Sequence, residues 1–151
     1  MGFIDEIKAK AKADKKTIVL PETEDIRTYE AAEAVLREGT ANLVLVGNKE
    51  EIEKNREGFD ISGATIVDPA TAETTAGYIE KLVELRQAKG MTEEKAKELL
   101  LNNYLYYGVM MVKMGDADGM VSGACHSTAD TLRPCLQILK TKPGTKLVSA
   151  F

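Results

Sequence analysis

The chain has 151 residues, of which 44% are hydrophobic and 29% charged, a balance typical of one globular domain with its own core. Its net charge is -4, and its 20 basic residues are spread among 24 acidic ones, which excludes nucleic acid as the main partner. No segment has the apolar length of a signal peptide or a membrane span, so we expect a cytoplasmic protein that contacts no membrane.

Short apolar runs rich in β-branched residues alternate with amphipathic segments along the chain. The runs that predict buried strands are Thr17–Leu20, Leu43–Val46, Ala64–Val67, Gly119–Ser122 and a fifth that begins at Lys146. The predicted helices are a short one at Phe3–Ile7, then Asp25–Glu38, Glu50–Arg56, 72–88, Thr92–Leu100, Tyr104–Met114 and one that ends near Lys140. This alternation predicts an α/β fold with a parallel sheet and helices on both faces.

The sequence ends on the apolar run Leu147–Phe151, with neither a helix nor a polar tail after it. A natural domain can end on a strand, but a sheet interrupted in mid-sequence explains this ending at least as well, and we expect a truncated part. A terminal strand of this kind leaves an apolar, unpaired edge that can pair with a second chain. We therefore expect a homo-oligomer.

The stretch Asp118–Pro134, DGMVSGACHSTADTLRP, gathers small polar residues where the fourth predicted strand turns into a helix. Ligands of open parallel sheets bind beyond the carboxyl ends of the strands, and Gly123 allows a sharp turn or a close approach there. The capping box STAD predicts a helix that opens at Ser127. Proline is disfavoured in a helix interior. Because Pro134 follows closely, this helix either starts at Ser127 with a kink or starts later, near Thr131.

The polar groups of this turn predict a binding site for an anion. Hydroxyls of Ser122, Ser127 and Thr128, free N–H groups at the helix start and the guanidinium of Arg133 suit phosphate or carboxylate. The alternative is that the hydroxyls only cap the helix and that Arg133 is solvated. His126 is a candidate acid or base near neutral pH, with a purely local hydrogen bond as its alternative.

Other candidate residues carry weaker signals. Cys125 near a helix start suits a lowered pKa, but a small buried thiol is the favoured interpretation. Two cysteines make no disulfide framework or zinc motif, and we expect no metal; Cys135 and Met110–Met111 are predicted core residues. Arg86, near the end of a helix, is either an anion ligand or a cation that suits the helix dipole. The stretch LPETEDIRT, Leu20–Thr28, is either a further site segment or a cap with surface charge.

Six segments carry a resemblance to a known family. LPETEDIRT, ANLVLVGN, IVDP, ELRQAKGMT, DGMVSGACHSTADTLRP and KTKPGTKLVSAF occur in this order and together resemble the N-terminal half of the phosphate acetyltransferases (phosphotransacetylases), within the phosphate acetyl/butyryl transferase family. The resemblance covers essentially the whole chain. It implies an isocitrate-dehydrogenase-like fold of two α/β domains, in which residues 1–151 form the N-terminal portion and the second domain and the C-terminal return segment are absent. It also implies a homodimeric enzyme that interconverts acetyl-CoA plus phosphate with acetyl phosphate plus CoA.

The resemblance also implies roles for single residues. By position, Arg133 and Arg86 match arginines that hold anionic substrate, and Ser127 and Thr128 match the family's hydroxyl pair. The family's proposed base, an Asp, and a Ser–Arg pair lie in the C-terminal half, so we expect residues 1–151 alone to be inactive. No cofactor is expected because CoA is a substrate, and direct attack by CoA is favoured over an acyl-enzyme on Cys125. A phosphate butyryltransferase and a non-catalytic ligand-binding or dimerisation module stay open as alternatives.

Overall fold

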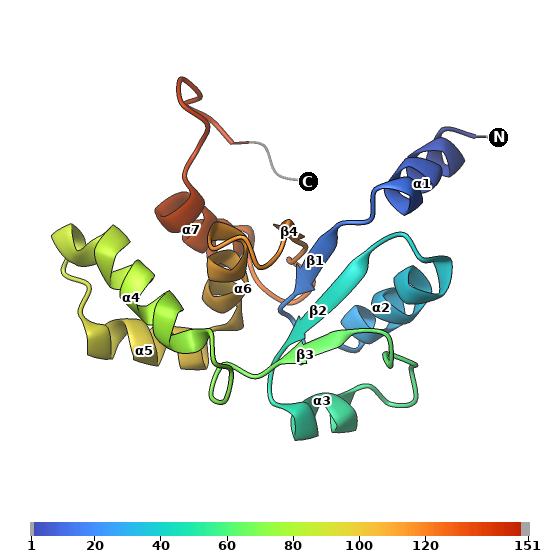
Figure 1. The fold of residues 1–151 in the computed structure, drawn as a ribbon, viewed down its shortest axis with the longest axis horizontal. Coiled ribbons are helices and arrows are strands. Elements are labelled where there is room, and N and C mark those ends of the chain that lie inside the picture. Colours follow the sequence, from blue (N-terminus) through green and yellow to red (C-terminus); the bar gives the residue numbers. More distant parts are fainter. Residues whose placement is uncertain (1, 149–151) are drawn as a thin grey trace.

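The computed structural model describes residues 2–148, and its elements alternate along the chain as predicted (Figure 1). The helices are α1 (Phe3–Ala13), α2 (Ile26–Glu38), α3 (Lys49–Asn55), α4 (Thr75–Arg86), α5 (Glu93–Asn102), α6 (Tyr104–Lys113) and α7 (Thr128–Pro134), with the 3-10 turn η1 (Gln87–Lys89) and the π-helical turn η2 (Cys135–Leu139). The strands are β1 (Thr17–Leu20), β2 (Asn42–Val46), β3 (Thr65–Val67) and β4 (Gly119–Met120). The predicted α/β class is confirmed.

The four strands form one parallel sheet in the order β3-β2-β1-β4. The chain moves from β1 to β2 and β3 on one side and then crosses back to place β4 on the other side of β1. The winding direction therefore reverses between β1 and β4. Because open α/β sheets bind ligands at such a reversal, the fold singles out the loops that follow Leu20 and Met120.

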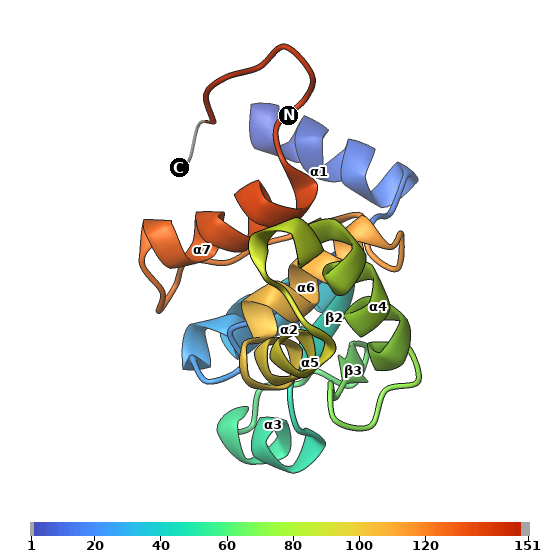
Figure 2. The ribbon, with the colours of Figure 1, turned by 90° about the vertical axis from the view of Figure 1, so that its left-hand side faces the viewer.

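Helices cover both faces of the sheet, and each face has a separate core. In β2, Leu43 and Leu45 pack on one side while Val44 and Val46 pack on the other, and all four are buried. A strand buried on both faces needs a continuous apolar run, which is the pattern that the sequence shows. Figure 2 views the molecule from the side of α4 and α5, which lie with α6 in front of the strands; α2 and α3 serve the opposite core.

Helix α6 packs directly on the sheet, as its apolar composition predicts. A Cβ atom at Gly108 would lie 2.8 Å from Met120 Sδ and 3.1 Å from Val19 Cγ1, so the backbone of α6 approaches β1 and β4 closely. Met110 and Met111 are buried, which confirms them as core residues. Within residues 2–148, no helix is both long and apolar enough to cross a lipid bilayer.

The predicted fourth and fifth strands are wrong in extent. β4 ends at Met120 instead of Ser122, because Gly123 turns the chain at a φ of 114°, in the left-handed region that favours glycine. Lys146, Leu147 and Val148 belong to no strand, and the rest of the predicted fifth strand, 149–151, lies outside the described residues.

The two alternatives for the last helix are resolved by its cap. Ser127 is the N-cap of α7 and its Oγ accepts a hydrogen bond from the N–H of Asp130 (3.1 Å), so the helix opens at Thr128. Proline supplies no N–H for the helical ladder, and α7 passes at Pro134 into the wider turn η2. The predicted irregularity at the proline is thus a change from α-helix to π-helical turn.

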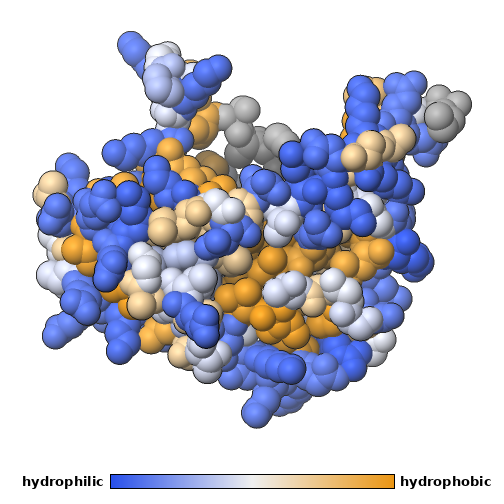
Figure 3. All heavy atoms as spheres, viewed as in Figure 1, coloured by the Kyte–Doolittle hydropathy of each residue, from blue (hydrophilic) through white to orange (hydrophobic). Residues whose placement is uncertain are grey.

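Helix α1 projects from the body of the molecule and has no buried residue (Figure 1). Its predicted apolar side chains are present but exposed: Phe3 by 74%, Ile4 by 61% and Ile7 by 47%. Elsewhere the surface is divided: α3 is hydrophilic, whereas apolar surface reaches solvent over the strands in the centre of the view (Figure 3). Within the described residues, α1 therefore stays outside both cores.

Candidate functional site

The loops after β1 and β4 meet at the winding reversal, and one buried carboxylate joins them. Oε1 of Glu22 accepts hydrogen bonds from the N–H groups of Gly123 (2.6 Å) and Ala124 (2.9 Å), and Oε2 accepts one from the N–H of Cys125 (2.8 Å). Glu22 is only 3% exposed. Successive N–H groups that point at one anion form a typical anion-binding nest, and here the chain's own carboxylate fills it. The predicted substrate contact at Gly123 therefore cannot use this N–H.

Two side chains of the β4 loop also contact Glu22. His126 Nδ1 lies 2.7 Å from Oε2, and the thiol of Cys125 donates to the same oxygen at 3.1 Å. Burial alone would raise the pKa of Glu22, but the hydrogen bonds from His126, Cys125 and the backbone lower it well below its usual range. Glu22 is therefore held as a carboxylate. His126 makes a local hydrogen bond to it, which was the alternative to an acid–base function for this residue.

The prediction of a small buried thiol at Cys125 is wrong, because the residue is exposed. The alternative, a lowered pKa, is also wrong. Desolvation of the sulfur and hydrogen bonds to Glu22 and Glu24, whose Oε1 lies 3.1 Å from Sγ, raise the pKa of Cys125 above its usual range. A thiol that stays protonated is a poor nucleophile, which agrees with the expectation that Cys125 carries no acyl group.

The stretch after β1 has a structural function that the sequence left open. Asp25 caps α2 and pairs with the guanidinium of Arg27, whose Nη2 also donates to the carbonyl of Ala124 at 2.6 Å. Thr23 Oγ1 donates to the carbonyl of Val46, and the buried hydroxyl of Tyr29 donates to the carbonyl of Thr23. These bonds fix the loop that carries Glu22.

Helix α7 presents the predicted hydroxyls and Arg133 to solvent. The Ser127 hydroxyl donates to Asp130 Oδ2 (2.8 Å), and Arg133 Nη1 pairs with the other oxygen, Oδ1, at 3.1 Å. Hydrogen bonds within residues 2–148 do not use the N–H groups of Thr128 and Ala129, which face out from the helix start. The side chain of Arg133 is 55% exposed, and a ligand can compete for it with an exposed aspartate.

Arg86 of α4 and Arg133 of α7 come from two helices that both pack against α6. Tyr106 of α6 donates a hydrogen bond to Gln137 Oε1 at 2.8 Å. Burial raises the pKa of Tyr106, while the positive charges of Arg133 and Arg86 act in the opposite direction. Both positive charges therefore influence this phenol, while the contact that Arg133 itself makes is with Asp130.

A buried hydroxyl near the same loop lacks a partner. The Oγ of Ser122 is buried and has no hydrogen bond within the described part of the chain. The Oγ1 of Thr131 in α7 shares this property. Buried polar atoms are normally paired, so both hydroxyls have bonding capacity to spare.

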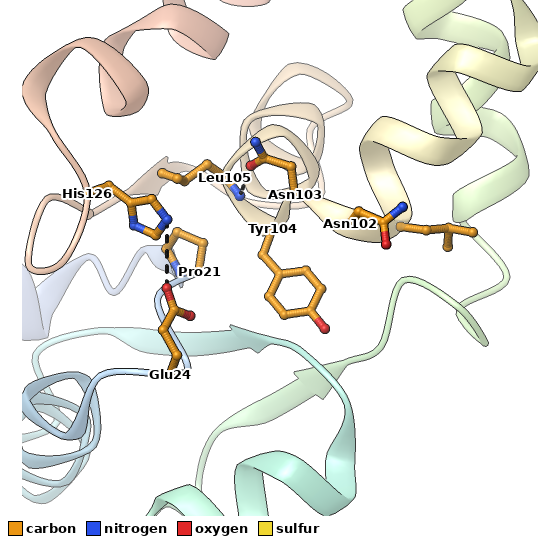
Figure 4. Close-up of a pocket in the computed structure, with 8 residues that line it drawn as sticks. Pro21, Glu24, Asn102, Asn103, Tyr104, Leu105 and His126 are labelled. Atoms are coloured by element: carbon orange, nitrogen blue, oxygen red, sulfur yellow. Dashed lines mark hydrogen bonds and ion pairs between the residues drawn. The ribbon is translucent and has the colours of Figure 1, made fainter.

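A cavity of about 380 Å³ opens beside the winding reversal. Its walls are formed by Pro21, Glu24, Leu101, Asn102, Asn103, Tyr104, Leu105 and His126. Figure 4 shows His126 and Glu24 together on one side of this space, with Asn102, Asn103 and Tyr104 from the α5–α6 corner on the other. Of the predicted site residues, His126 alone lines this cavity. The predicted residues therefore do not gather around one cavity: Gly123 bonds to Glu22, and Ser127 and Arg133 bond to Asp130.

Comparison of the chain with known proteins identifies its family. The family described as phosphate acetyl/butaryl transferase matches residues 2–151. The chain belongs to this transferase family. It is 53% identical over its whole length to the phosphate acetyltransferase of Acetivibrio thermocellus and 55% identical to that of Thermoanaerobacterium thermosaccharolyticum, of which it covers 45% and 46%.

Solved structures agree with this assignment. A EutD phosphotransacetylase from Staphylococcus aureus is similar with a TM-score of 0.85 and 42% identity, over 95% of this chain and 44% of that one. A phosphotransacetylase from Streptococcus pyogenes is similar with a TM-score of 0.87 and 40% identity, over 97% and 46%. The transferase chain therefore spans about half the length of the relatives that it matches.

The central residue of this geometry that the sequence of this transferase chain did not single out is Glu22. In the stretch LPETEDIRT it is one of three acidic residues, and its partners lie about 100 positions further on. A signal was present, however. A parallel sheet brings the carboxyl ends of β1 and β4 to one edge, and an acid after one strand faces free N–H groups after the other.

Proposed function

We propose that this chain supplies one wall of the active site of a phosphate acetyltransferase, in which Arg133 and Arg86 bind the phosphate group. The match to the family over residues 2–151 supports the reaction type, and the names of the most similar relatives favour the acetyl group over butyryl. The observation that carries the proposal is that Arg133 is exposed on α7, directly after the loop at the winding reversal, while Arg86 ends α4, and both helices pack against α6. Neither arginine is committed to a buried ion pair within residues 2–148.

The chemistry needs positive charge at this position. In the forward direction the CoA thiolate attacks the carbonyl carbon of acetyl phosphate, a C–S bond forms, and the C–O bond to phosphate breaks with its electron pair. Phosphate leaves as an anion, and in the reverse direction it is the nucleophile. Two guanidinium groups stabilise the charge that develops on the phosphoryl oxygens, and arginine offers paired donors for them.

The start of α7 supplements the arginines. The N–H groups of Thr128 and Ala129 have no partner among residues 2–148, and Thr128 adds an exposed hydroxyl. Ser127 is the cap that holds this turn in place. Its hydroxyl donates to Asp130 and can bind substrate directly only when that hydrogen bond is broken. The spare hydroxyl of Ser122 is a further donor beside the loop.

Cys125 is not part of this transfer. Its thiol is hydrogen-bonded to two carboxylates and stays protonated, whereas an acyl-enzyme needs an activated thiolate. CoA attacks the acetyl carbonyl directly, and the thiolate of CoA requires a base. The partners of the protein are then acetyl-CoA, phosphate and acetyl phosphate, without a cofactor, in a cytoplasmic homo-oligomer.

The test is the steady-state kinetics of Arg133→Ala in the protein at its full natural length, with acetyl-CoA and phosphate. Loss of one transition-state donor lowers kcat/KM by roughly 10²-fold or more. Arg37→Ala is the matched control, since Arg37 is exposed at the end of α2 on the opposite core, and its kcat/KM stays within about twofold. Equal kinetics of the Arg133 variant and the wild type would contradict the proposal.

A further inference from the structure

A compact group of metal-ligand atoms lies between the β1 and β4 loops. One ligand atom each from Glu22, Cys125 and His126 lies within 4.8 Å of the other two. The individual distances are shorter still: 2.7 Å from His126 Nδ1 to Glu22 Oε2, 3.1 Å from Cys125 Sγ to the same oxygen, and 3.5 Å from Sγ to Nδ1. A carboxylate oxygen, a thiol sulfur and an imidazole nitrogen thus form a small triangle.

The triangle has nearly the dimensions of three corners of a zinc tetrahedron. Bond lengths of about 2.3 Å to sulfur and about 2.1 Å to nitrogen and oxygen place tetrahedral ligand atoms about 3.4–3.6 Å apart. The Sγ–Nδ1 separation already has this value, and the two contacts of Oε2 need to open by about 0.5–0.7 Å. Cys125 is exposed and His126 half-buried, so both side chains have room for this adjustment.

Glu22 is prepared to act as a fixed ligand. Its Oε1 is held by the N–H groups of Gly123 and Ala124, while Oε2 faces Cys125 and His126. Metal-bound carboxylates and histidines are normally oriented by hydrogen bonds at their other polar atoms. Glu24 Oε1 lies 3.7 Å from His126 Nε2, on the ring nitrogen that does not face Glu22. The acidic pair also gives the site a negative charge that favours a cation.

We propose that Glu22, Cys125 and His126 bind a thiophilic divalent cation of the Zn²⁺ type, with Glu24 orienting the imidazole from outside. On binding, Cys125 releases its S–H proton to solvent and an S–metal bond forms, while Nδ1 offers its lone pair and Nε2 carries the ring proton. Of the residues named here, His126 and Glu24 also line the cavity beside the winding reversal. Nitrogen and sulfur ligands exclude Mg²⁺ and Ca²⁺, which prefer oxygen. The proposal is independent of the acetyl-transfer function.

The experiment is a titration of the purified, metal-free, reduced protein with Co²⁺ and, in competition with a chelating dye, with Zn²⁺. The site predicts one Zn²⁺ per chain and a thiolate-to-cobalt charge-transfer band in the near ultraviolet. Cys125→Ala removes the band and weakens Zn²⁺ binding by roughly 10²-fold, because loss of a direct ligand costs at least as much as loss of an outer partner. Glu24→Gln keeps the band and weakens binding by about 10-fold.

Cys135→Ala is the matched control, since this second thiol packs against the core of α6 and is bonded to the Thr131 carbonyl. The control variant keeps both the band and the affinity of the wild type. Circular dichroism confirms that each variant is folded, which the exposure of Cys125 and Glu24 favours. A charge-transfer band that survives in Cys125→Ala, or Zn²⁺ affinity equal to that of the wild type in this variant, would overturn the proposal.

Discussion

Replacing Glu22 by glutamine tests whether one carboxylate holds the β4 loop. The carboxylate accepts hydrogen bonds on both oxygens, from the N–H groups of Gly123 and Ala124 on one and of Cys125 on the other, where His126 Nδ1 also lies. An amide offers one carbonyl oxygen, and its NH₂ group must then face donors on the other side. Histidine can adapt by changing its tautomer, but a backbone N–H cannot.

The magnitude follows from these bonds. One buried N–H without a partner costs about 1–3 kcal/mol, and the two remaining bonds lose the charge that makes such bonds worth about 1.5–3 kcal/mol each. Water reaches the exposed Gly123–Cys125 loop and recovers part of this loss, so the expected decrease in the free energy of unfolding is about 2–4 kcal/mol. In a chain of this length the corresponding decrease in Tm is about 5–15 °C.

The assay is urea and thermal unfolding, followed by circular dichroism in a buffer that contains a chelator. Glu24→Gln is the matched control, because Glu24 lies two positions away with a side chain that is 52% exposed, and we expect it to cost less than about 0.5 kcal/mol. If Glu22→Gln is as stable as this control, the carboxylate does not organise the loop and the reasoning is refuted.

Two further predictions concern the cores. Gly108→Ala places a methyl group 2.8 Å from Met120 Sδ and should lower the free energy of unfolding by about 1–3 kcal/mol. The control Gly77→Ala, with open space at its Cβ, should raise the free energy of unfolding by about 0.5–1 kcal/mol. Equal stabilities of the two variants in urea would contradict the close packing of α6. Burial raises the pKa of Tyr29 to about 12, against about 10 in the unfolded chain, so unfolding releases a proton between these pH values and stability falls as the pH rises through them. Tyr29→Phe should flatten this fall in urea unfolding measured between pH 9 and 11.5, and an unchanged slope would be evidence against the buried phenol.

The sequence predicted the elements well because their signals are local. Apolar runs such as Leu43–Val46 and the glycine cap at Gly39, with a φ of 69°, need no knowledge of distant residues. The α/β class and the helices on both faces followed from the alternation. The length of β4 was not predictable in this way, since the chain turns at Gly123 and directs the N–H groups of Gly123, Ala124 and Cys125 to Glu22, about 100 positions away in sequence.

The site was predicted in part for the same reason. The cap at Ser127 is encoded within four residues, and the structure confirms it. The engagement of His126 by Glu22 and the raised pKa of Cys125 depend on side chains about 100 positions away, and no periodicity reports such contacts. The substrate-binding functions of Arg86 and Arg133 stay predictions, although both residues lie on helices that pack against α6.

The binding of inorganic phosphate to the purified chain tests most directly whether Arg86 and Arg133 act on one anion. The dissociation constant is measured by NMR titration for the wild type, Arg86→Ala, Arg133→Ala and the double variant, with Arg37→Ala as the control. Because both guanidinium groups face the same ligand, the account predicts that each single variant weakens binding and that the two effects are coupled by about 0.5–3 kcal/mol. Strictly additive effects, or phosphate affinity in the double variant equal to that of the wild type, would contradict the account.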